Sequence, residues 1–214
     1  MTETSRDESQ AERAEPAKVH KEWYEITAVA LMSIMAVFTA WCGFESSKWG
    51  GEMSIAFSQA GSNRVQASDA RSAARDAFQL DAMVFAQWLD ATAAGEEELA
   101  DYFEGVFSPA FTLAFEAWDG ETRTPFGLPE YVAPGTAEAE EFTKKADDAY
   151  ERALLNNQRG DNYSLLTVMF ALVLFLTAMS QRAGPAWSQR ALLFVAIGVS
   201  VVGLVILSTF PIKI

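Results

Sequence analysis

The sequence predicts an all-α membrane protein with three transmembrane helices. Two long antiparallel helices protrude from the membrane in this prediction, forming an extracytoplasmic helical bundle capped by two short helices. The first observation is a set of three apolar runs without any charged residue, at residues 26–44, 165–179 and 191–210. The second is charge: residues 45–161 hold 22 Asp and Glu against 9 Lys and Arg, whereas residues 162–214 hold no acidic residue. Such apolar runs satisfy their backbone polar groups as helices and can cross a bilayer.

The N-terminal part divides into a tail and a first span. Residues 1–21 are rich in charge and lack apolar periodicity, so we expect a disordered tail. Residues 22–49 are assigned to the first transmembrane helix, read as an uncleaved signal-anchor. Trp23 and Trp49 near its two ends are typical of aromatic anchors at membrane interfaces.

Residues 50–161 are expected to form the acidic helical domain. Gly50 and Gly51 lower helix propensity and predict a hinge or kink at the membrane edge. Residues 53–92 are rich in alanine and free of proline, which predicts a long helix. Its second half is apolar on nearly every face and must therefore be covered on more than one side.

Shorter elements follow at the end of that helix. Gly95 is expected to terminate it, a short acidic helix is expected at residues 96–107, and Pro109 opens another that extends to Trp118. Residues 119–135 contain three prolines and three glycines, which predicts a surface loop.

The second long helix is expected to start at Thr136 as its N-cap and to run without interruption into the second span. Phe142, Ala146, Ala149 and Ala153 follow the spacing of a packing stripe along it. The remaining predicted segments are the second span, a short basic cytoplasmic loop, and the third span with the C-terminus, at residues 162–181, 182–190 and 191–214. In the third span, small residues such as Ala196 and Ser200 permit close helix contact.

Basic residues in short loops set the predicted orientation. Arg182 and Arg190 lie in the loop between the second and third spans, and Arg13, Lys18 and Lys21 precede the first. Both groups place the N-terminus in the cytoplasm and residues 50–161 outside it. The expected location is therefore a cell membrane, crossed more than once.

The composition argues against several functions. The acidic domain would repel nucleic acid. His20, the only histidine, falls in the predicted tail, and Cys42, the only cysteine, falls in the first span, so we expect no catalytic residues, no metal, no cofactor and no enzymatic activity. Glu97, Asp101 and Glu104 share one helical face that could take Ca²⁺ or Mg²⁺, but a solvated acidic face is the preferred interpretation.

Aromatic and apolar residues provide two sets of candidate contacts. A ligand between the long helices would lie near Phe85, Trp88 and Tyr150. A partner at the tip of the domain would contact Phe126, Leu128 and Tyr131 in the proline-rich loop, because semi-rigid aromatic loops are suited to binding. The alternative for the loop is a cap that packs over the helix ends.

Two segments, Gln66–Asp69 ("QASD") and Arg159–Tyr163 ("RGDNY"), together with the order of elements, resemble a group of bacterial three-pass membrane proteins without an assigned activity. The resemblance covers nearly the whole chain after the tail. It implies the same fold and topology and a bacterial inner membrane as the location, and it implies nothing about mechanism.

The leading functional prediction is a non-enzymatic integral membrane protein whose acidic helical domain serves as an interaction or structural module in a membrane complex. Its expected partners are the lipid bilayer and either further copies of the chain or another membrane protein. The alternatives are a ligand-sensing or transporter-accessory subunit and an oligomeric channel. The partner, any ligand and the oligomeric number are left open by the sequence.

Overall fold

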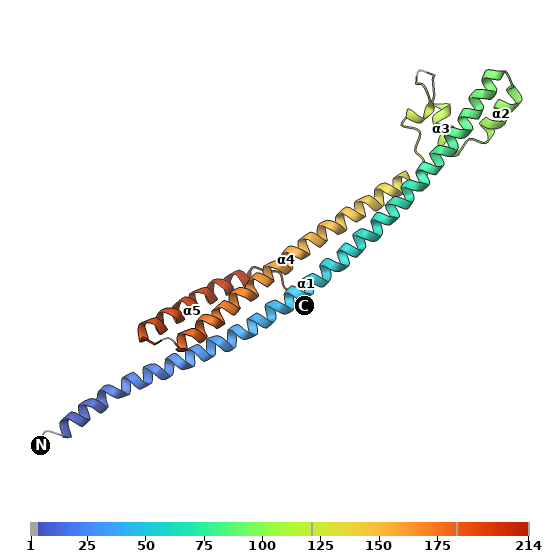
Figure 1. Cartoon of the computed structure of the whole chain (residues 1–214). Coiled ribbons are helices and arrows are strands. Elements are labelled where there is room, and N and C mark those ends of the chain that lie inside the picture. Colours follow the sequence, from blue (N-terminus) through green and yellow to red (C-terminus); the bar gives the residue numbers. More distant parts are fainter. Residues whose placement is uncertain (1–3, 121, 183, 214) are drawn as a thin grey trace. The chain divides into compact units, whose positions relative to one another are not determined.

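The computed structural model describes residues 4–120, 122–182 and 184–213, with side chains from residue 23 onward. These ranges contain helices and no strand, which confirms the all-α prediction. The elements, shown in Figure 1, are α1 (Thr4–Ala94), α2 (Glu97–Gly105), α3 (Pro109–Glu116), the 3₁₀ turn η1 (Pro125–Gly127), α4 (Thr136–Arg182) and α5 (Ala186–Ser208). Three of them, α1, α4 and α5, contain stretches long and apolar enough to cross a membrane. The backbone of residues 4–21, expected to be a disordered tail, is part of helix α1, whereas residues 1–3 lie outside the described residues.

Helix α1 continues without interruption through Gly50 and Gly51, where the sequence favours a hinge or kink. The hinge or kink itself stays a prediction. The helix α4 lies close by here: a Cβ built on Gly160 would stand 3.5 Å from the carbonyl oxygen of Ser46. The hydroxyl of Ser46 donates a hydrogen bond to the Gly160 carbonyl at 3.0 Å. Contact with a neighbouring helix therefore offsets the low helix propensity of the two glycines.

The helices α1 and α4 contribute to two compact units, each described here by itself. Unit 1 comprises residues 1–54 and 153–214, and unit 2 comprises residues 55–152. In unit 1, α4 and α5 lie side by side (Figure 1) and pack with α1 around an apolar core. The buried core residues are Met35, Cys42, Trp49, Tyr163, Leu166, Phe170, Val173 and Ala196.

One face of α5 consists of small residues that permit close packing in unit 1. Ala196, Ser200 and Gly203 are buried on it. A Cβ added at Gly203 would lie 2.6 Å from Cε1 of Phe170 and 2.7 Å from Cε of Met169. The absence of a side chain at Gly203 thus makes room for the aromatic ring at the centre of the unit 1 core.

Hydroxyl groups within the apolar runs bond to their own helices. The carbonyls that accept these hydrogen bonds lie three or four residues earlier, as expected for Ser and Thr in apolar helices. This holds for Ser33, Thr39, Thr167, Thr177 and Ser200.

Unit 2 is built on stripes of alanine. Ala56, Ala60, Ala67 and Ala70 are buried on α1, and Ala139, Ala146 and Ala149 are buried on α4. Phe142, which the sequence placed on this stripe, is half-buried and instead lies under the ammonium group of Lys145. Small side chains allow two helix backbones to approach closely, so this part of the core contains little side-chain volume.

The start of α4 differs from the expectation. Thr136 is the first helical residue rather than the N-cap, and its hydroxyl donates to the carbonyl of Ala133 at 2.8 Å. Gly135 precedes it with φ of 95°, a conformation that favours glycine. A Cβ at Gly135 would stand 2.6 Å from the carbonyl oxygen of Ala70, so the turn requires both the conformation and the space.

Candidate functional site

An aromatic cluster forms the large-residue core of unit 2. Phe85 of α1 is buried, stacks on Trp88 with ring centroids 5.7 Å apart, and meets Phe111 of α3 edge to face at 5.4 Å. Such ring pairs add to the stabilisation that burial provides. The cluster comprises Phe85, Phe107 and Phe111, packed against Val84, Trp88, Phe115, Trp118, Phe126 and Tyr131.

The local sequence explains where α3 begins and why its aromatic residues join the cluster. Ser108 caps the helix by accepting a hydrogen bond from the Phe111 backbone N–H at 3.1 Å, and Pro109 occupies the first turn. A serine cap followed by proline is a strong signal for a helix start. The helix then places Phe111 and Phe115, four residues apart, on the side that faces Phe85.

The proline-rich loop is fixed to the same cluster. Phe126 lies 5.8 Å from Phe85 and 4.7 Å from Phe111, measured between ring centroids. The Tyr131 hydroxyl donates a hydrogen bond to Oδ2 of Asp81 at 2.8 Å, and Asp81 is itself buried on α1. Burial and the neighbouring carboxylate both raise the pKa of Tyr131, because each disfavours the phenolate. The phenol therefore stays a hydrogen-bond donor at neutral pH.

The six candidate contact residues thus fall into separate places. Four of them, Phe85, Trp88, Phe126 and Tyr131, lie together in the aromatic cluster. Leu128 is half-buried and takes part in the turn at η1, where its N–H donates to the Pro125 carbonyl. This packing of the loop favours the cap interpretation over a free aromatic loop.

Tyr150 lies elsewhere in unit 2. It meets Phe57 edge to face at 5.6 Å, and the guanidinium of Arg64 stands 5.3 Å from its ring centroid. Phe57 and Phe85 belong to one helix and are 28 residues apart, which corresponds to about 42 Å along its axis. A small ligand therefore cannot contact Phe85, Trp88 and Tyr150 at once.

Outside the cluster, unit 2 exposes large apolar side chains. Leu80 and Met83 of α1 are 63% and 61% exposed, and Leu113 of α3 is 61% exposed. At 100° per residue, Leu80 and Met83 lie about 140° and 160° from Phe85 around α1. They therefore occupy the side of the helix opposite the aromatic cluster, and we call Leu80 and Met83 the outer face of α1.

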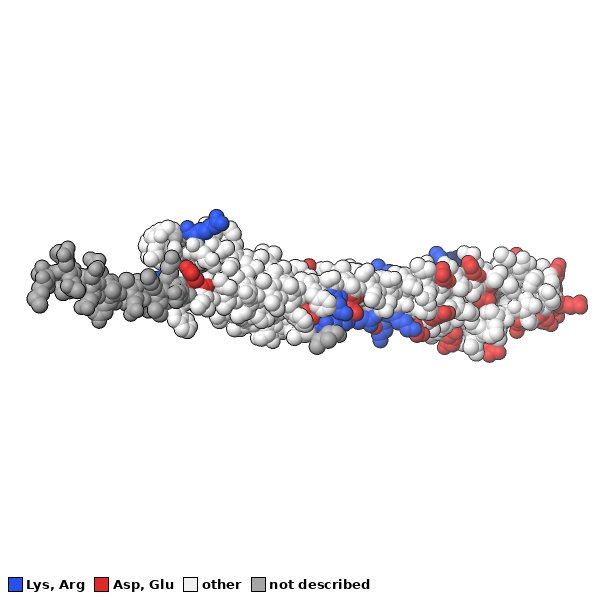
Figure 2. Space-filling model, turned by 90° about the horizontal axis from the view of Figure 1, so that it is seen from below, with Lys and Arg blue, Asp and Glu red and all other residues white. Residues whose placement is uncertain are grey.

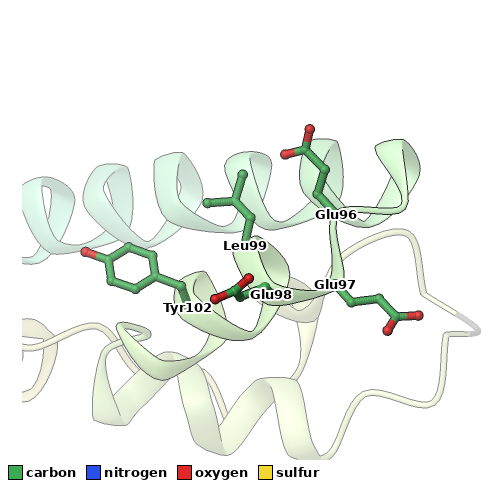
Figure 3. Close-up of a pocket in the computed structure, with 5 residues that line it drawn as sticks. All are labelled: Glu96, Glu97, Glu98, Leu99 and Tyr102. Carbon is green, nitrogen blue, oxygen red and sulfur yellow. The ribbon is translucent and has the colours of Figure 1, made fainter.

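Acidic residues surround a shallow hollow at α2. Its lining consists of Glu96, Glu97, Glu98, Leu99 and Tyr102. Figure 3 shows that the three carboxylates point in different directions rather than toward a common centre. Within the described ranges, no group of three or more His, Cys, Asp or Glu side chains could hold a metal ion. A solvated acidic surface accounts for this arrangement.

Unit 1 contains a buried carboxylate that the sequence does not predict. Glu45 follows directly after the apolar run 26–44, and it is fully buried. Its Oε2 accepts a hydrogen bond from the backbone N–H of Lys213 at 3.0 Å. Neither Oε1 of Glu45 nor Nε1 of Trp49 finds a hydrogen-bond partner among the described residues. A buried carboxylate is costly unless its oxygens are hydrogen-bonded or paired, so Glu45 is a candidate for a functional role.

The contacts around Glu45 hold the segment that follows α5. The Tyr163 hydroxyl donates to the Pro211 carbonyl at 3.0 Å, and the Lys213 ammonium pairs with Glu52 at 2.8 Å. The same ammonium and the Arg159 guanidinium lie 5.5 Å and 4.6 Å from the Trp49 ring. We call this arrangement the C-terminal clamp. The sequence shows that Glu45 lies one turn before Trp49. It does not indicate the hydrogen bond of Glu45 with Lys213, because the two residues are 168 positions apart.

Comparison with known proteins finds no match for this chain among protein-family models, curated proteins or solved structures.

Proposed function

We propose that the chain is a non-enzymatic integral membrane protein of a bacterial cytoplasmic membrane, and that its acidic helical domain is an interaction or structural module in a membrane complex. The three membrane-length helices support the location. The segments Gln66–Asp69 and Arg159–Tyr163 support kinship with the bacterial three-pass group that the sequence resembles.

In this proposal, unit 2 is an antiparallel pair of long helices that stands outside the cytoplasm. The order of contacts supports the antiparallel arrangement. Hydrogen bonds and ion pairs join Gln59 to Arg152, Arg64 to Asp147 and Arg71 to Thr143. Residue numbers on α4 thus fall as those on α1 rise. The basic residues Arg182 and Arg190 beside the turn between α4 and α5 support a cytoplasmic position for that turn.

The single observation behind the interaction module is the outer face of α1. Leu80 and Met83 remain more than half exposed, whereas the other side of the helix packs in the aromatic cluster. Residues 55–152 contain 19 Asp and Glu against 7 Lys and Arg, and acidic side chains are spread over unit 2 in Figure 2. Exposed apolar residues within a strongly charged surface are typical of a protein-binding patch. The charge favours a partner with a basic rim over a second acidic copy.

The alternatives are supported less well. A ligand sensor built on Phe85, Trp88 and Tyr150 is incompatible with the separation of Tyr150 from the other two. For a channel, the hydroxyl groups of Thr177 and Ser200 already bond to carbonyls of their own helices.

Photo-crosslinking in intact membranes tests the proposal. A photoreactive amino acid placed at Leu80 or at Met83 should yield one discrete adduct with a single protein. The control position is Leu113, which is equally exposed but lies on α3. The same set of adducts from all three positions, or no adduct from the outer face, would contradict the proposed interaction module.

A further inference from the structure

An apolar groove runs along the surface of unit 1 between α1 and α5. It has a volume of about 430 Å³, and its lining is almost entirely apolar. The lining residues are Val37, Phe38, Trp41, Leu204, Leu207, Ser208 and Ile212. All the residues from α1 belong to the charge-free run 26–44, so the groove lies at the depth of the acyl chains of a bilayer.

One side of α1 extends from this groove to the ammonium group of Lys48. Val37, Trp41, Phe44 and Lys48 are spaced by four, three and four residues, which places them on one side of the helix. The rings of Trp41 and Phe44 stand 6.0 Å apart, and the Lys48 ammonium lies 5.9 Å from the Phe44 ring centroid. Lys48 is about 10 Å from Trp41 along the axis and about 6 Å beyond the end of the charge-free run. That position corresponds to the headgroup layer.

The charge of Lys48 is available to a ligand. Among the described side chains, no carboxylate lies within ion-pair distance of its ammonium. Glu52, one turn further along α1, is paired with Lys213 at 2.8 Å. Glu45, one turn before Lys48, is fully buried and accepts a hydrogen bond from the Lys213 N–H. Glu52 is thus paired with another cation and Glu45 is enclosed in the unit 1 core, so the exposed Lys48 ammonium favours an anion.

We propose that unit 1 binds one anionic phospholipid, with an acyl chain in the groove between α1 and α5 and the phosphate at Lys48. The glycerol region would lie beside Phe44, which separates the groove from the ammonium. Apolar lining at chain depth and an unpaired cation at headgroup depth are independent features, and a single phospholipid matches both. The proposal rests on the membrane location of unit 1 and is independent of any protein partner of unit 2.

Native mass spectrometry of the purified full chain tests the site, with phosphatidylglycerol and phosphatidylcholine of identical acyl chains added in separate titrations. The expected result is preferential retention of one phosphatidylglycerol. Lys48→Gln should reduce that preference about fivefold, the effect of one lysine on binding to an anionic lipid surface. Arg190→Gln, which removes an exposed cation beside the other end of α5, should leave it unchanged.

The groove is tested separately by Val37→Trp, which fills it. The matched control is Val168→Trp, because Val37 and Val168 are both 68% exposed within the apolar runs. Only Val37→Trp should abolish retention of the single lipid. Equal retention of the two lipids by the unmodified chain would overturn the proposal, as would an unchanged preference in Lys48→Gln. Because the lipid comparison needs no variant, a folding defect in either tryptophan variant leaves the proposal open to refutation.

Discussion

The two units are built from the same two long helices but are held together differently. In unit 1, α5 packs against α1 and α4 through a small-residue face, and the polar C-terminal clamp around Glu45 fixes the segment that follows it. In unit 2, alanine stripes hold α1 and α4 close, and large side chains concentrate in the aromatic cluster. The comparison shows how one helix can serve two environments: its packing residues change along its length while its secondary structure does not.

The largest expected effect concerns the aromatic cluster. Phe111→Ala should destabilise unit 2 by about 3–5 kcal/mol, because it leaves a cavity under Phe85, Phe107 and Phe126. Leu113→Ala on the same helix is the control and should cost less than about 0.5 kcal/mol, since Leu113 is largely exposed. Chemical unfolding of the purified protein, followed by near-UV circular dichroism, measures both. Similar effects from the two variants would show that the cluster is not the core of unit 2.

The hydrogen bond between Tyr131 of the loop and Asp81 of α1 should have the next largest effect on the free energy of unfolding. Tyr131→Phe leaves the buried Asp81 carboxylate without the hydroxyl of Tyr131 and should cost about 1–3 kcal/mol. Tyr102→Phe, at an exposed tyrosine, should cost nothing measurable. An unfolding midpoint in denaturant that is equal for the two variants would contradict this role.

The same bond predicts a dependence on alkaline pH. The pKa of Tyr131 is raised in the folded protein, so its contribution to stability is complete below the unfolded pKa of about 10. It is lost as the pH rises from there through the folded pKa, because the unfolded chain releases the proton first. Unfolding curves at pH 8 and pH 11 should therefore differ less for Tyr131→Phe than for the unmodified chain. An equal loss of stability in both proteins would show that other groups cause it.

In unit 1, the C-terminal clamp should respond to the loss of its acceptor. Glu45→Ala removes the oxygen that binds the Lys213 N–H and should destabilise the packing of the last residues by about 1–3 kcal/mol. Glu45→Gln retains an acceptor and should have a smaller effect, because a neutral group is easier to bury. Hydrogen exchange of the Lys213 amide reports the difference. Equal exchange rates in the two variants would show that the charge of Glu45, rather than the hydrogen bond, holds the clamp.

The smallest expected effects come from replacing glycines with alanine, and their sign depends on whether the added Cβ would meet neighbouring atoms. Gly50→Ala and Gly51→Ala should each stabilise α1 by about 0.5–1 kcal/mol, since an added Cβ meets no atom within 4 Å at either position. Gly203→Ala should instead destabilise unit 1, because the Cβ would collide with Phe170 and Met169. Thermal unfolding in detergent gives the sign of each change. A stabilising Gly203→Ala would contradict the close approach of α4 and α5.

Helical periodicity and apolar run length sufficed to predict an all-α chain with three membrane-length helices, because both depend on neighbouring residues. The start of α3 at Pro109 and the end of α1 before Gly95 were predictable for the same reason. The burial of Glu45 was not, since it depends on a segment 168 residues later. The separation of Tyr150 from Phe85 was missed because the sequence does not give the distance between two aromatic residues that both face a partner helix. The continuity of α1 through Gly50 was not predictable from propensity alone, because propensity does not include contact with α4.

In the proposed function, unit 2 joins a membrane complex through the outer face of α1. The most direct test is native mass spectrometry of the chain extracted gently from its own membranes, for the unmodified protein and for Leu80→Ser/Met83→Ser. We expect a defined complex with a stoichiometric protein partner that is lost in the double variant. A bare monomer from the unmodified chain, or a complex that the double variant retains, would contradict it.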